Sequence, residues 1–507
     1  MTIRSKWQSF HRWAGLLFAV FLVVFCISGI ILNHREAVAE CNVSRSLLPP
    51  SYHVRNYNNG IIKGTLQLED CTLAAYGNGG IWLTDPDFSN FRDFNAGLPA
   101  GADRRNIRNM VRTADGTLYA AAQYGLHRYD GHAWKEVDIP GNKARISDVS
   151  LMPDGRGLII LSRDKAYKLS DGKAAPIDIK APEGYKPEVS LFKTVWMIHS
   201  GELFGLTGRI VVDFIAVVIT FLCVTGIILF VLPYATRRAA RNKVSEKVKR
   251  IGGMFKWNFR WHDRAGYWLF VLTLVIAVTG TCLRPPLMIP LVLTKTAPVP
   301  GSALDSPNPW HDKLRAIRYD AHMQKWILST SEGFYFLDTD FLGMPVKADV
   351  AGVPPVSPMG VNVMHQENDS TWIVGSFSGI FRWNPEKGNV SDYFTGKTYV
   401  NTGGRPIAHD AIAGFSSDTR NTAVFDYSKG TDLFGATNPQ LARQPLSLWN
   451  TALELHVGRC YNTLLGPISE LFVFISGILL IFILISGYIV HRRINRRTAD
   501  KHPKNNP

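Results

Sequence analysis

The sequence is poor in cysteine and in the motifs that go with common soluble chemistries. Six cysteines occur among 507 residues, and none belongs to a CxxC or CxxCH motif. Covalently attached c-type haem and cysteine-rich zinc sites use such spacings, so the sequence indicates neither. There is also no nucleotide-binding glycine loop and no hydrolase nucleophile elbow. The sequence therefore gives no sign of nucleotide-driven or hydrolytic chemistry.

Charge is absent from four long apolar runs, which cover residues 13–32, 214–235, 265–283 and 471–490. Each run is about long enough to cross a bilayer as a helix. A buried helix of a soluble protein rarely stays uncharged over such a length, and four such helices in one chain are rarer still. The sequence therefore predicts an α-helical membrane protein with a four-helix transmembrane bundle.

Acidic residues are fewer than basic ones, 41 against 56, and the net charge is +15. The excess is concentrated beside the apolar runs. Nine Lys and Arg side chains and the single acid Glu246 lie in segment 237–260, six more basic residues follow Val490, and three precede the first run. Because basic segments stay in the cytoplasm, we expect both termini there and the two long segments outside. This distribution accounts for the charge without a nucleic-acid partner.

We expect eight parts along the chain. They are the cytoplasmic N-terminus with the first span (1–35), an external β-rich segment (36–190), an interfacial approach with the second span (191–236), a basic cytoplasmic loop (237–260), the third span (261–284), a second external β-rich segment (285–450), an approach with the fourth span (451–491) and a basic cytoplasmic tail (492–507). Ala37-Val38-Ala39 resembles a signal-peptidase site, but the first run is long for a signal sequence, so an uncleaved anchor is favoured.

Short strand patterns recur through both external segments. One runs from Gly116 to Trp134, and related patterns begin at Gly79, Gly155, Lys325 and Thr371. Their spacing of about 40 residues is typical of propeller blades. The patterns resemble the sensor-propeller repeats of bacterial two-component regulators. Neither segment holds enough units to close alone, so we expect one joint propeller, with two separate β-sandwiches as the alternative.

Two of the cysteines lie in the first external segment. Disulfides persist outside the cytoplasm, so Cys41 and Cys71 are candidates for a disulfide.

Six of the fourteen histidines lie close to the ends of the apolar runs: His11, His34, His199, His262, His456 and His491. Four belong to a repeat. His11-Arg-Trp-Ala-Gly matches His262-Asp-Arg-Ala-Gly, and the stretch at His199 matches that at His456. Each run also carries a small pair late in its course: Ser28-Gly29, Thr225-Gly226, Thr279-Gly280 and Ser486-Gly487. The four spans thus resemble two copies of one hairpin, related by an axis along the membrane normal.

Histidines near both membrane faces, with glycines close by, suit b-type haem held by two axial imidazoles. Gly15 and Gly266 lie one helical turn from His11 and His262, on the same face. His11 and His34 are separated by roughly 34 Å of helix, so they cannot share one haem. The alternative is an interfacial position for these histidines within a belt of tryptophans: Trp7, Trp13, Trp257, Trp261 and Trp268. Placement at repeat-related positions favours ligation.

These motifs resemble the PepSY-associated transmembrane helix family. The resemblance rests on Phe10-His11-Arg12-Trp13, on the stretch from His199 to Arg209 and on their second copies. It covers the four helices and their approaches. In the external segments we find no PepSY module, and the second copy has Leu465-Gly466-Pro467 in place of the glycine-arginine spacing. The family includes dihaem reductases of the bacterial inner membrane that act on ferric siderophores in the periplasm.

The resemblance implies four haem-ligand positions, at His11, His199, His262 and His456, and two b-type haems. The repeat pairs His11 with His262 at the inner face and His199 with His456 at the outer face. His34 and His491 would then flank a pair or replace a member of it. His34 is the better replacement, because the approach through Gly205 and Gly208 can displace His199.

The function that follows is transmembrane electron transfer to a periplasmic ferric complex, as in a siderophore-iron reductase. Quinol or a cytoplasmic reductase would be the electron donor. The alternative is a non-haem protein, in which an external propeller senses or binds a partner and the helices only anchor it in the lipid bilayer.

Overall fold

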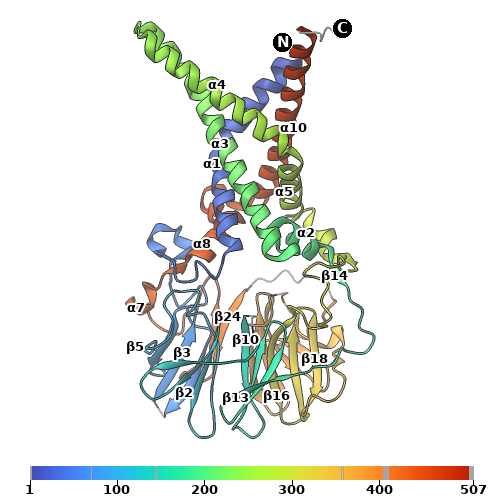
Figure 1. Ribbon diagram of the computed structural model, residues 1–507. Helices are drawn as coiled ribbons and strands as arrows, with labels where there is room; N and C mark the ends of the chain where they lie inside the picture. Colours follow the sequence, from blue (N-terminus) through green and yellow to red (C-terminus); the bar gives the residue numbers. More distant parts are fainter. Residues whose placement is uncertain are drawn as a thin grey trace. The chain divides into compact units, whose positions relative to one another are not determined.

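The computed structural model describes residues 3–69, 71–142, 145–355, 357, 359–402 and 410–501. The chain divides into two compact units. One consists of Met1–Val38, Pro187–Asp305 and Trp449–Pro507, and the other consists of Ala39–Lys186 and Ser306–Leu448. The first unit is helical and the second is built of small antiparallel sheets (Figure 1). The protein therefore combines membrane-type helices with a β-rich unit.

Three helices of the first unit are long and apolar enough to cross a membrane. They are α1 (Ile3–Asn33), α3 (Gly205–Arg241) and α10 (Ser469–Lys501), and their apolar windows have mean hydropathies of 2.9, 3.0 and 2.7. Large apolar side chains point outward from these helices: Leu17 on α1, for example, is 70% exposed. A lipid environment accepts such side chains, and each helix satisfies its backbone hydrogen bonds internally.

The expected third span is broken. Helix α4 (Ser245–Trp268) and helix α5 (Phe270–Cys282) meet at Leu269 with a bend of 66°, and they give a fourth span only if the bent pair counts as one. Just past the break, the Thr273 hydroxyl donates to the carbonyls of Leu269 and Phe270. Such back-bonding is a known contributor to helix bending. The predicted third span at 261–284 therefore corresponds to the end of α4 and to α5, with a break between them.

The expected basic loop over 237–260 is also helical for most of its length. Helix α3 continues to Arg241 and α4 begins at Ser245, so only three residues separate them. Lys and Arg favour helices, and the segment contains no proline. The basic residues therefore extend two helices beyond the apolar region instead of forming an irregular connection.

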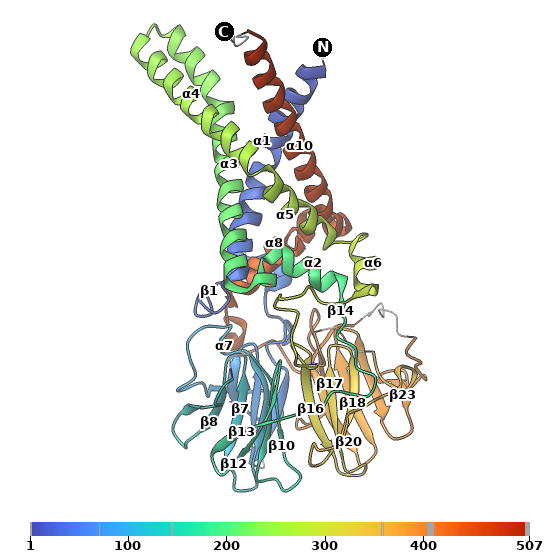
Figure 2. The same ribbon diagram turned by 45° about the vertical axis from the view of Figure 1, so that its right-hand side comes forward.

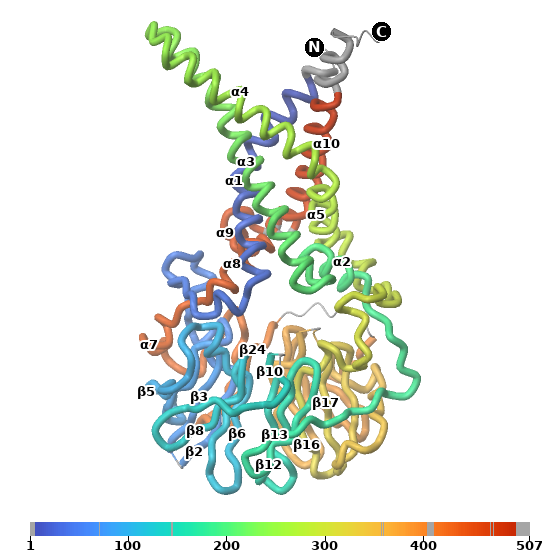
Figure 3. The backbone as a smooth tube through the Cα atoms, viewed as in Figure 1, coloured from blue at the N-terminus to red at the C-terminus, as the bar shows by residue number. Residues whose placement is uncertain are grey.

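Helices α1, α3, α5 and α10 lie side by side (Figure 2). Buried residues of α1 and α3, including Ala19, Leu22 and Ile215, form one cluster between them. The start of α1 and the end of α10 lie at one end of the unit. The short helices α2 (Leu191–Ser200) and α8 (Leu448–His456) lie at the other. There the indole of Trp449 in α8 donates to the Leu32 carbonyl of α1. Figure 3 shows α8 beside the C-terminal end of α1.

Within the described residues, the β-rich unit contains five four-stranded antiparallel meanders and a two-stranded hairpin in chain order, besides a second, shorter two-stranded sheet. The strands are β2–β5 (Gly64–Glu69, Thr72–Gly77, Gly80–Thr84, Phe91–Asp93), β6–β9 (Ile107–Arg112, Leu118–Ala122, Leu126–Tyr129, Trp134–Val137), β10–β13 (Ile146–Leu151, Leu158–Ser162, Ala166–Ser170, Lys173–Ile177), β16–β19 (Leu314–Asp320, Lys325–Thr330, Gly333–Asp338, Val346–Lys347), β20–β23 (Val363–Asn368, Thr371–Ser376, Gly379–Asn384, Asn389–Asp392) and β24–β25 (Ile412–Ser416, Ala423–Asp426).

A few short elements complete the chain. Strand β1 (Asn42–Val43) pairs with β26 (Leu446–Ser447), and β14 (Val189–Ser190) pairs with β15 (Lys295–Thr296). The remaining short helices are α6 (Met288–Leu293), α7 (Pro439–Ala442) and α9 (Asn462–Leu465).

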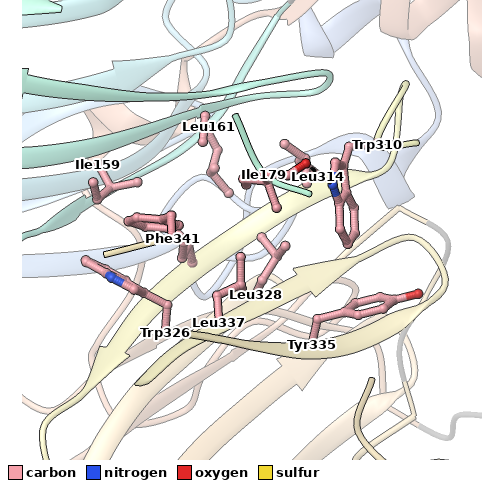
Figure 4. Close-up of a cluster of buried hydrophobic side chains, with 12 residues drawn as sticks. Ile159, Leu161, Ile179, Trp310, Leu314, Trp326, Leu328, Tyr335, Leu337 and Phe341 are labelled. Atoms are coloured by element: carbon pink, nitrogen blue, oxygen red, sulfur yellow. Dashed lines mark hydrogen bonds between the residues drawn. The ribbon is translucent and has the colours of Figure 1, made fainter. Parts of the chain in front are cut away.

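Buried clusters join each sheet to the next. Between β10–β13 and β16–β19, Ile159 and Leu161 pack with Leu314 and Trp326 (Figure 4). Comparable clusters join the other neighbours, and the last sheet packs on the first through Phe425 and Trp82. Ala39–Lys186 and Ser306–Leu448 therefore build one compact unit with a shared core.

Cys41 and Cys71 are both exposed free thiols. Cys71 lies in the turn that joins β2 to β3, whereas the Cys41 carbonyl accepts from the Leu448 amide beside the β1–β26 pair. The two thiols are not joined in this structure, and the disulfide stays a prediction.

Candidate functional site: two histidine pairs

The structure brings four histidines together as two pairs. His11 of α1 lies beside His262 of α4, with ring centroids 6.2 Å apart and ring planes at 73°. His199 of α2 lies beside His456 of α8, with centroids also 6.2 Å apart and planes at 51°. These are the two pairs that the sequence repeat predicts. We call them the His11–His262 pair and the His199–His456 pair.

Each of the four imidazoles contacts a hydroxyl on another helix through Nδ1. The contacts are His11 to Ser486 (3.1 Å), His456 to Ser28 (3.0 Å), His262 to Thr225 (2.8 Å) and His199 to Thr279 (3.1 Å). Two of the rings also contact the carbonyl three residues before the hydroxyl: His11 meets Ile483 and His456 meets Phe25, each at 3.1 Å. Four equivalent contacts therefore orient the four rings.

The hydroxyls fix the position of the ring proton. Each one donates to a carbonyl of its own helix; Thr225 Oγ1, for example, donates to Phe221 at 2.7 Å. A hydroxyl that donates its only proton in this way can only accept from the imidazole. Nδ1 therefore carries the proton and Nε2 presents its lone pair, which is the form that binds a metal.

A glycine follows each hydroxyl and makes room for the ring. A Cβ placed on Gly280 or Gly487 would lie 2.8 Å from His199 Cε1 or 3.0 Å from His11 Cε1. On Gly29 and Gly226 the corresponding distances to His456 and His262 are 3.4 and 3.6 Å. We call each hydroxyl–glycine unit a Ser/Thr-Gly seat. The sequence showed these pairs, but their role as seats appears only in three dimensions.

The spacing of each pair fits a metal bound between the two rings. Nε2 of these four histidines has no hydrogen-bond partner anywhere in the part of the chain that the structure describes. A metal bound to imidazole lies about 2 Å from the nitrogen, so opposed rings on one metal have centroids roughly 6 Å apart. Over the described residues, no group of three or more His, Cys, Asp and Glu side chains converges. The remaining ligands of such a metal would have to come from a cofactor.

Open space adjoins the His11–His262 pair. A Cβ on Gly15, one turn from His11, would have no atom within 4 Å, and one on Gly266, one turn from His262, would meet only Leu222 at 3.8 Å. This space accords with the approach of a flat macrocycle. The residues around this pair therefore leave room for a flat cofactor that two imidazoles could hold.

His34 and His491 make other contacts. His34 Nε2 lies 2.6 Å from an Asp213 carboxylate oxygen. His491 Nδ1 lies 2.8 Å from Asp263, and its ring stacks on Tyr267 at 4.1 Å. The structure places His199, and not His34, opposite His456.

The glycines around His199 have a structural role. A Cβ on Gly208 would lie close to the Gly201 carbonyl oxygen, so the backbones of the α2 end and the α3 start touch there. This contact lets the chain reverse direction directly after His199. The His199 ring keeps its place opposite His456.

The two pairs lie at opposite ends of the helical unit. His11 and Gly29, which is part of the His456 seat, are 18 residues apart on α1, or roughly 27 Å of helix. Between them, apolar side chains such as Leu22 and Cys26 are buried against α3. The helix interface between the two ends is therefore apolar.

Comparison with known proteins identifies the N-terminal part. The family model described as the PepSY-associated TM region matches residues 2–232. Residues 2–232 are thus similar to that family. The matched region holds one histidine of each pair, His11 and His199, and two of the seats. Their partners, His262 and His456, belong to the second copy of the hairpin. No curated protein matches the chain.

Solved structures resemble the chain only remotely. One is a protein of unknown function from Bacteroides thetaiotaomicron, with 11% identity and a TM-score of 0.35, covering 74% of this chain and 69% of that one. Two others are extracellular domains of a hybrid two-component system and a one-component system of the same organism, with 8% and 10% identity and TM-scores of 0.34 and 0.31. Those matches cover 74% and 75% of this chain but 32% and 38% of the sensor chains.

Proposed function

We propose that this protein is a b-type dihaem electron-transfer protein that carries electrons across a membrane to a ferric complex, as a siderophore-iron reductase does. The observation that carries the proposal is the presence of two histidine pairs, each with centroids 6.2 Å apart. In both, a seat holds Nδ1, and Nε2 has no partner among the described residues. When bound, haem iron supplies one-electron redox chemistry.

The protein's own residues would set the conditions for that chemistry. The seat hydroxyls keep the proton on Nδ1 and hold the ring plane, so that Nε2 of each histidine is presented in a fixed direction. The apolar cluster of α1 and α3 excludes water from the interior between the two pairs. Both the ring positions and the exclusion of water are fixed by the fold. Such preorganisation lowers the reorganisation energy of electron transfer.

The distribution of charge supports an orientation in the bacterial inner membrane. The basic stretches of α3 and α4 follow the apolar part of α3, and both termini are flanked by basic residues. By the positive-inside rule these parts lie in the cytoplasm. The His11–His262 pair would then receive electrons from quinol or a cytoplasmic reductase. The His199–His456 pair would pass them to a periplasmic acceptor.

The proposal includes the finer architecture. We propose that α1, α3, the bent α4–α5 pair and α10 form a four-helix bundle. We also propose that the six sheets form one propeller on the periplasmic side. The sheet-to-sheet clusters support this, since they run through all six sheets and return from the last to the first.

The test is the haem content of the purified full-length protein. We expect two haems per chain in a pyridine haemochrome assay, a Soret band, and sharp α and β bands after dithionite reduction. The reduced protein should reoxidise on addition of a ferric siderophore. A folded but colourless preparation, produced with haem available, would overturn the proposal and favour the alternative of a membrane-anchored sensor.

A further inference from the structure

The β-rich unit contains a pocket with a strongly basic lining. Its volume is about 60 Å³, which is room for roughly four to six water molecules. Six cationic side chains line it: Lys63, Arg108, Arg145, Arg163, Arg315 and Arg318. The carboxylate in the lining is Asp148. The pocket therefore gathers far more positive than negative charge.

These cations come from four sheets and from both external segments of the sequence. Lys63 directly precedes β2, Arg108 lies in β6 and Arg145 directly precedes β10. Arg315 and Arg318 lie in β16. Five of the six positions are therefore on, or next to, the first strand of a sheet, and Arg163 directly follows β11. The shared fold, and not a local motif, assembles the pocket.

Protein contacts hold several of the cations in place. Arg318 donates to Asp148 at 2.5 Å and to the Met364 carbonyl at 3.2 Å. Arg108 donates to Gln123 Oε1 at 2.5 Å. Asp148 also accepts from the Ile317 amide, so it is already engaged and offsets little of the remaining charge. The positive charge is therefore fixed in position before any ligand binds.

The pocket also contains a donor without an acceptor. Gln123 is 1% exposed, and its Nε2 has no hydrogen-bond partner in the described structure, although its Oε1 accepts from Arg108. Burying an amide N–H group without an acceptor costs folding free energy, and native proteins rarely leave such a group without a hydrogen bond. An acceptor bound in the pocket would satisfy it.

The crowding of cations is itself unfavourable. Burial, together with neighbouring Arg108, holds the pKa of Lys63 well below its usual range. Burial, together with Arg163 and Arg145, lowers the pKa of Arg315 to about 10. Asp312, which lies 3.5 Å from Arg163, and Asp164 act on Arg315 in the opposite direction, so neighbouring carboxylates offset part of the positive charge. A bound anion would offset more of it.

We infer that this pocket binds a small multivalent oxyanion, one that presents several carboxylate or phosphate oxygens. Guanidinium groups match both oxyanions through paired N–H···O bonds, and several arginines around one ligand favour more than one negative charge. The volume admits a small anion or the charged end of a larger one. This inference concerns the β-rich unit alone and does not depend on haem.

The experiment is isothermal titration of the full-length protein in detergent, in a chloride buffer free of phosphate. Citrate, phosphate and acetate are titrated separately. We expect saturable binding of citrate or phosphate at one site per chain, with acetate at least tenfold weaker. The tighter of the two multivalent anions identifies the class of oxygen that the pocket prefers.

Two variants and a control locate the binding. Arg145→Glu changes an exposed cation at the pocket and should weaken binding at least tenfold, while Gln123→Met should weaken it without changing charge. Lys135→Glu is the matched control, because Lys135 is an exposed cation paired with Asp130 outside the pocket lining. The inference is overturned if neither citrate nor phosphate saturates the wild type, or if Arg145→Glu binds as tightly as Lys135→Glu. Haem absorbance plays no part in this measurement, so its failure is distinct from failure of the proposed function.

Discussion

A hydroxyl that already donates to its own helix can act on a neighbouring imidazole only as an acceptor. This is the situation of Thr225, which donates to Phe221 and Leu222 and lies 2.8 Å from His262 Nδ1. The helix backbone thus determines which ring nitrogen of His262 keeps its proton. Hydrogen bonding from Nδ1 to an acceptor also makes Nε2 more basic and strengthens it as a ligand.

Replacing Thr225 by Val tests this coupling. Valine keeps the shape of threonine but removes the acceptor, so we expect a less basic His262, a metal affinity lower by about 10- to 100-fold and a raised midpoint potential of one haem. A spectroelectrochemical titration of the purified variant measures the shift. Thr220→Val is the control, since Thr220 lies on the same helix and donates to Ala216 without contacting a histidine. Equal potentials in the two variants would show that the hydroxyl has no such role.

Replacing single histidines tests the pairs themselves. We expect His11→Ala and His262→Ala to lose one haem, and His199→Ala and His456→Ala to lose the other, because each haem needs both axial imidazoles. Each variant should retain about half of the haem, and the two groups should lose different spectral components. His34→Ala and His491→Ala are the controls and should keep both haems, since Asp213 and Asp263 are their partners. Full haem content in both His11→Ala and His199→Ala would show that these histidines are not haem ligands. The alternative, an interfacial role, would then hold.

At the scale of the helix, each seat is a place where one element must come close to another. The four seat glycines differ in how much space they leave. A methyl group would press on His199 from Gly280 and on His11 from Gly487, but it would make only an ordinary contact with His262 from Gly226. The distance between the seat glycine and the histidine ring therefore differs among the four seats.

The loss of haem caused by alanine substitutions at the seat glycines should be larger where the added methyl group comes closer to the histidine. Gly280→Ala should displace His199 and cost most of the haem at the His199–His456 pair. Gly226→Ala should leave haem content nearly unchanged, because a distance of 3.6 Å is an ordinary van der Waals contact. The effects of both substitutions are measured as the number of haems per chain and as the absorbance spectrum of the reduced protein. Gly252→Ala in α4 meets no atom within 4 Å and serves as the control for a glycine-to-alanine change in a helix. A Gly226→Ala variant that loses as much haem as Gly280→Ala would contradict the steric account.

The histidine pairs were accessible to sequence reasoning because the signal is a local repeat. His11 and His262 open matching stretches, and a two-fold arrangement brings matching positions together. The break at Leu269 was not accessible, since an apolar run looks the same whether the helix within it is straight or bent. The basic pocket was not accessible either. Lys63 and Arg315 are neighbours only because the first strands of distant sheets converge.

At the scale of the whole molecule, the β-rich unit has an acid-sensitive core. His127 on β8 is 3% exposed, and its Nδ1 has no hydrogen-bond partner in the described structure. Burial lowers its pKa to about 4. Between pH 6.5 and about 4 the unfolded chain binds a proton at this residue that the folded unit does not, so stability falls as the pH falls through this window.

We expect acid to lower the unfolding free energy of the β-rich unit by up to about 3 kcal/mol through His127, since one pKa unit corresponds to about 1.4 kcal/mol. The loss should begin near pH 6.5 and level off below about 4. Tryptophan fluorescence during thermal unfolding, repeated across this range, measures it. His127→Gln removes the titrating group and should flatten the profile. His132→Gln, an exposed histidine in the same sheet, should not. A profile of the same steepness in His127→Gln would assign the effect to other groups.

The shared core of the β-rich unit also has a consequence for how the protein is made. Ile159 and Leu161 are buried against Leu314 and Trp326, which leave the ribosome roughly 150 residues later, or about 10 to 30 seconds at ordinary rates of synthesis. During that interval the face of the β10–β13 sheet has no partner within the chain. A nascent chain arrested before Leu314 should therefore expose an aggregation-prone apolar surface. Such a chain should depend on chaperones that the complete protein does not need.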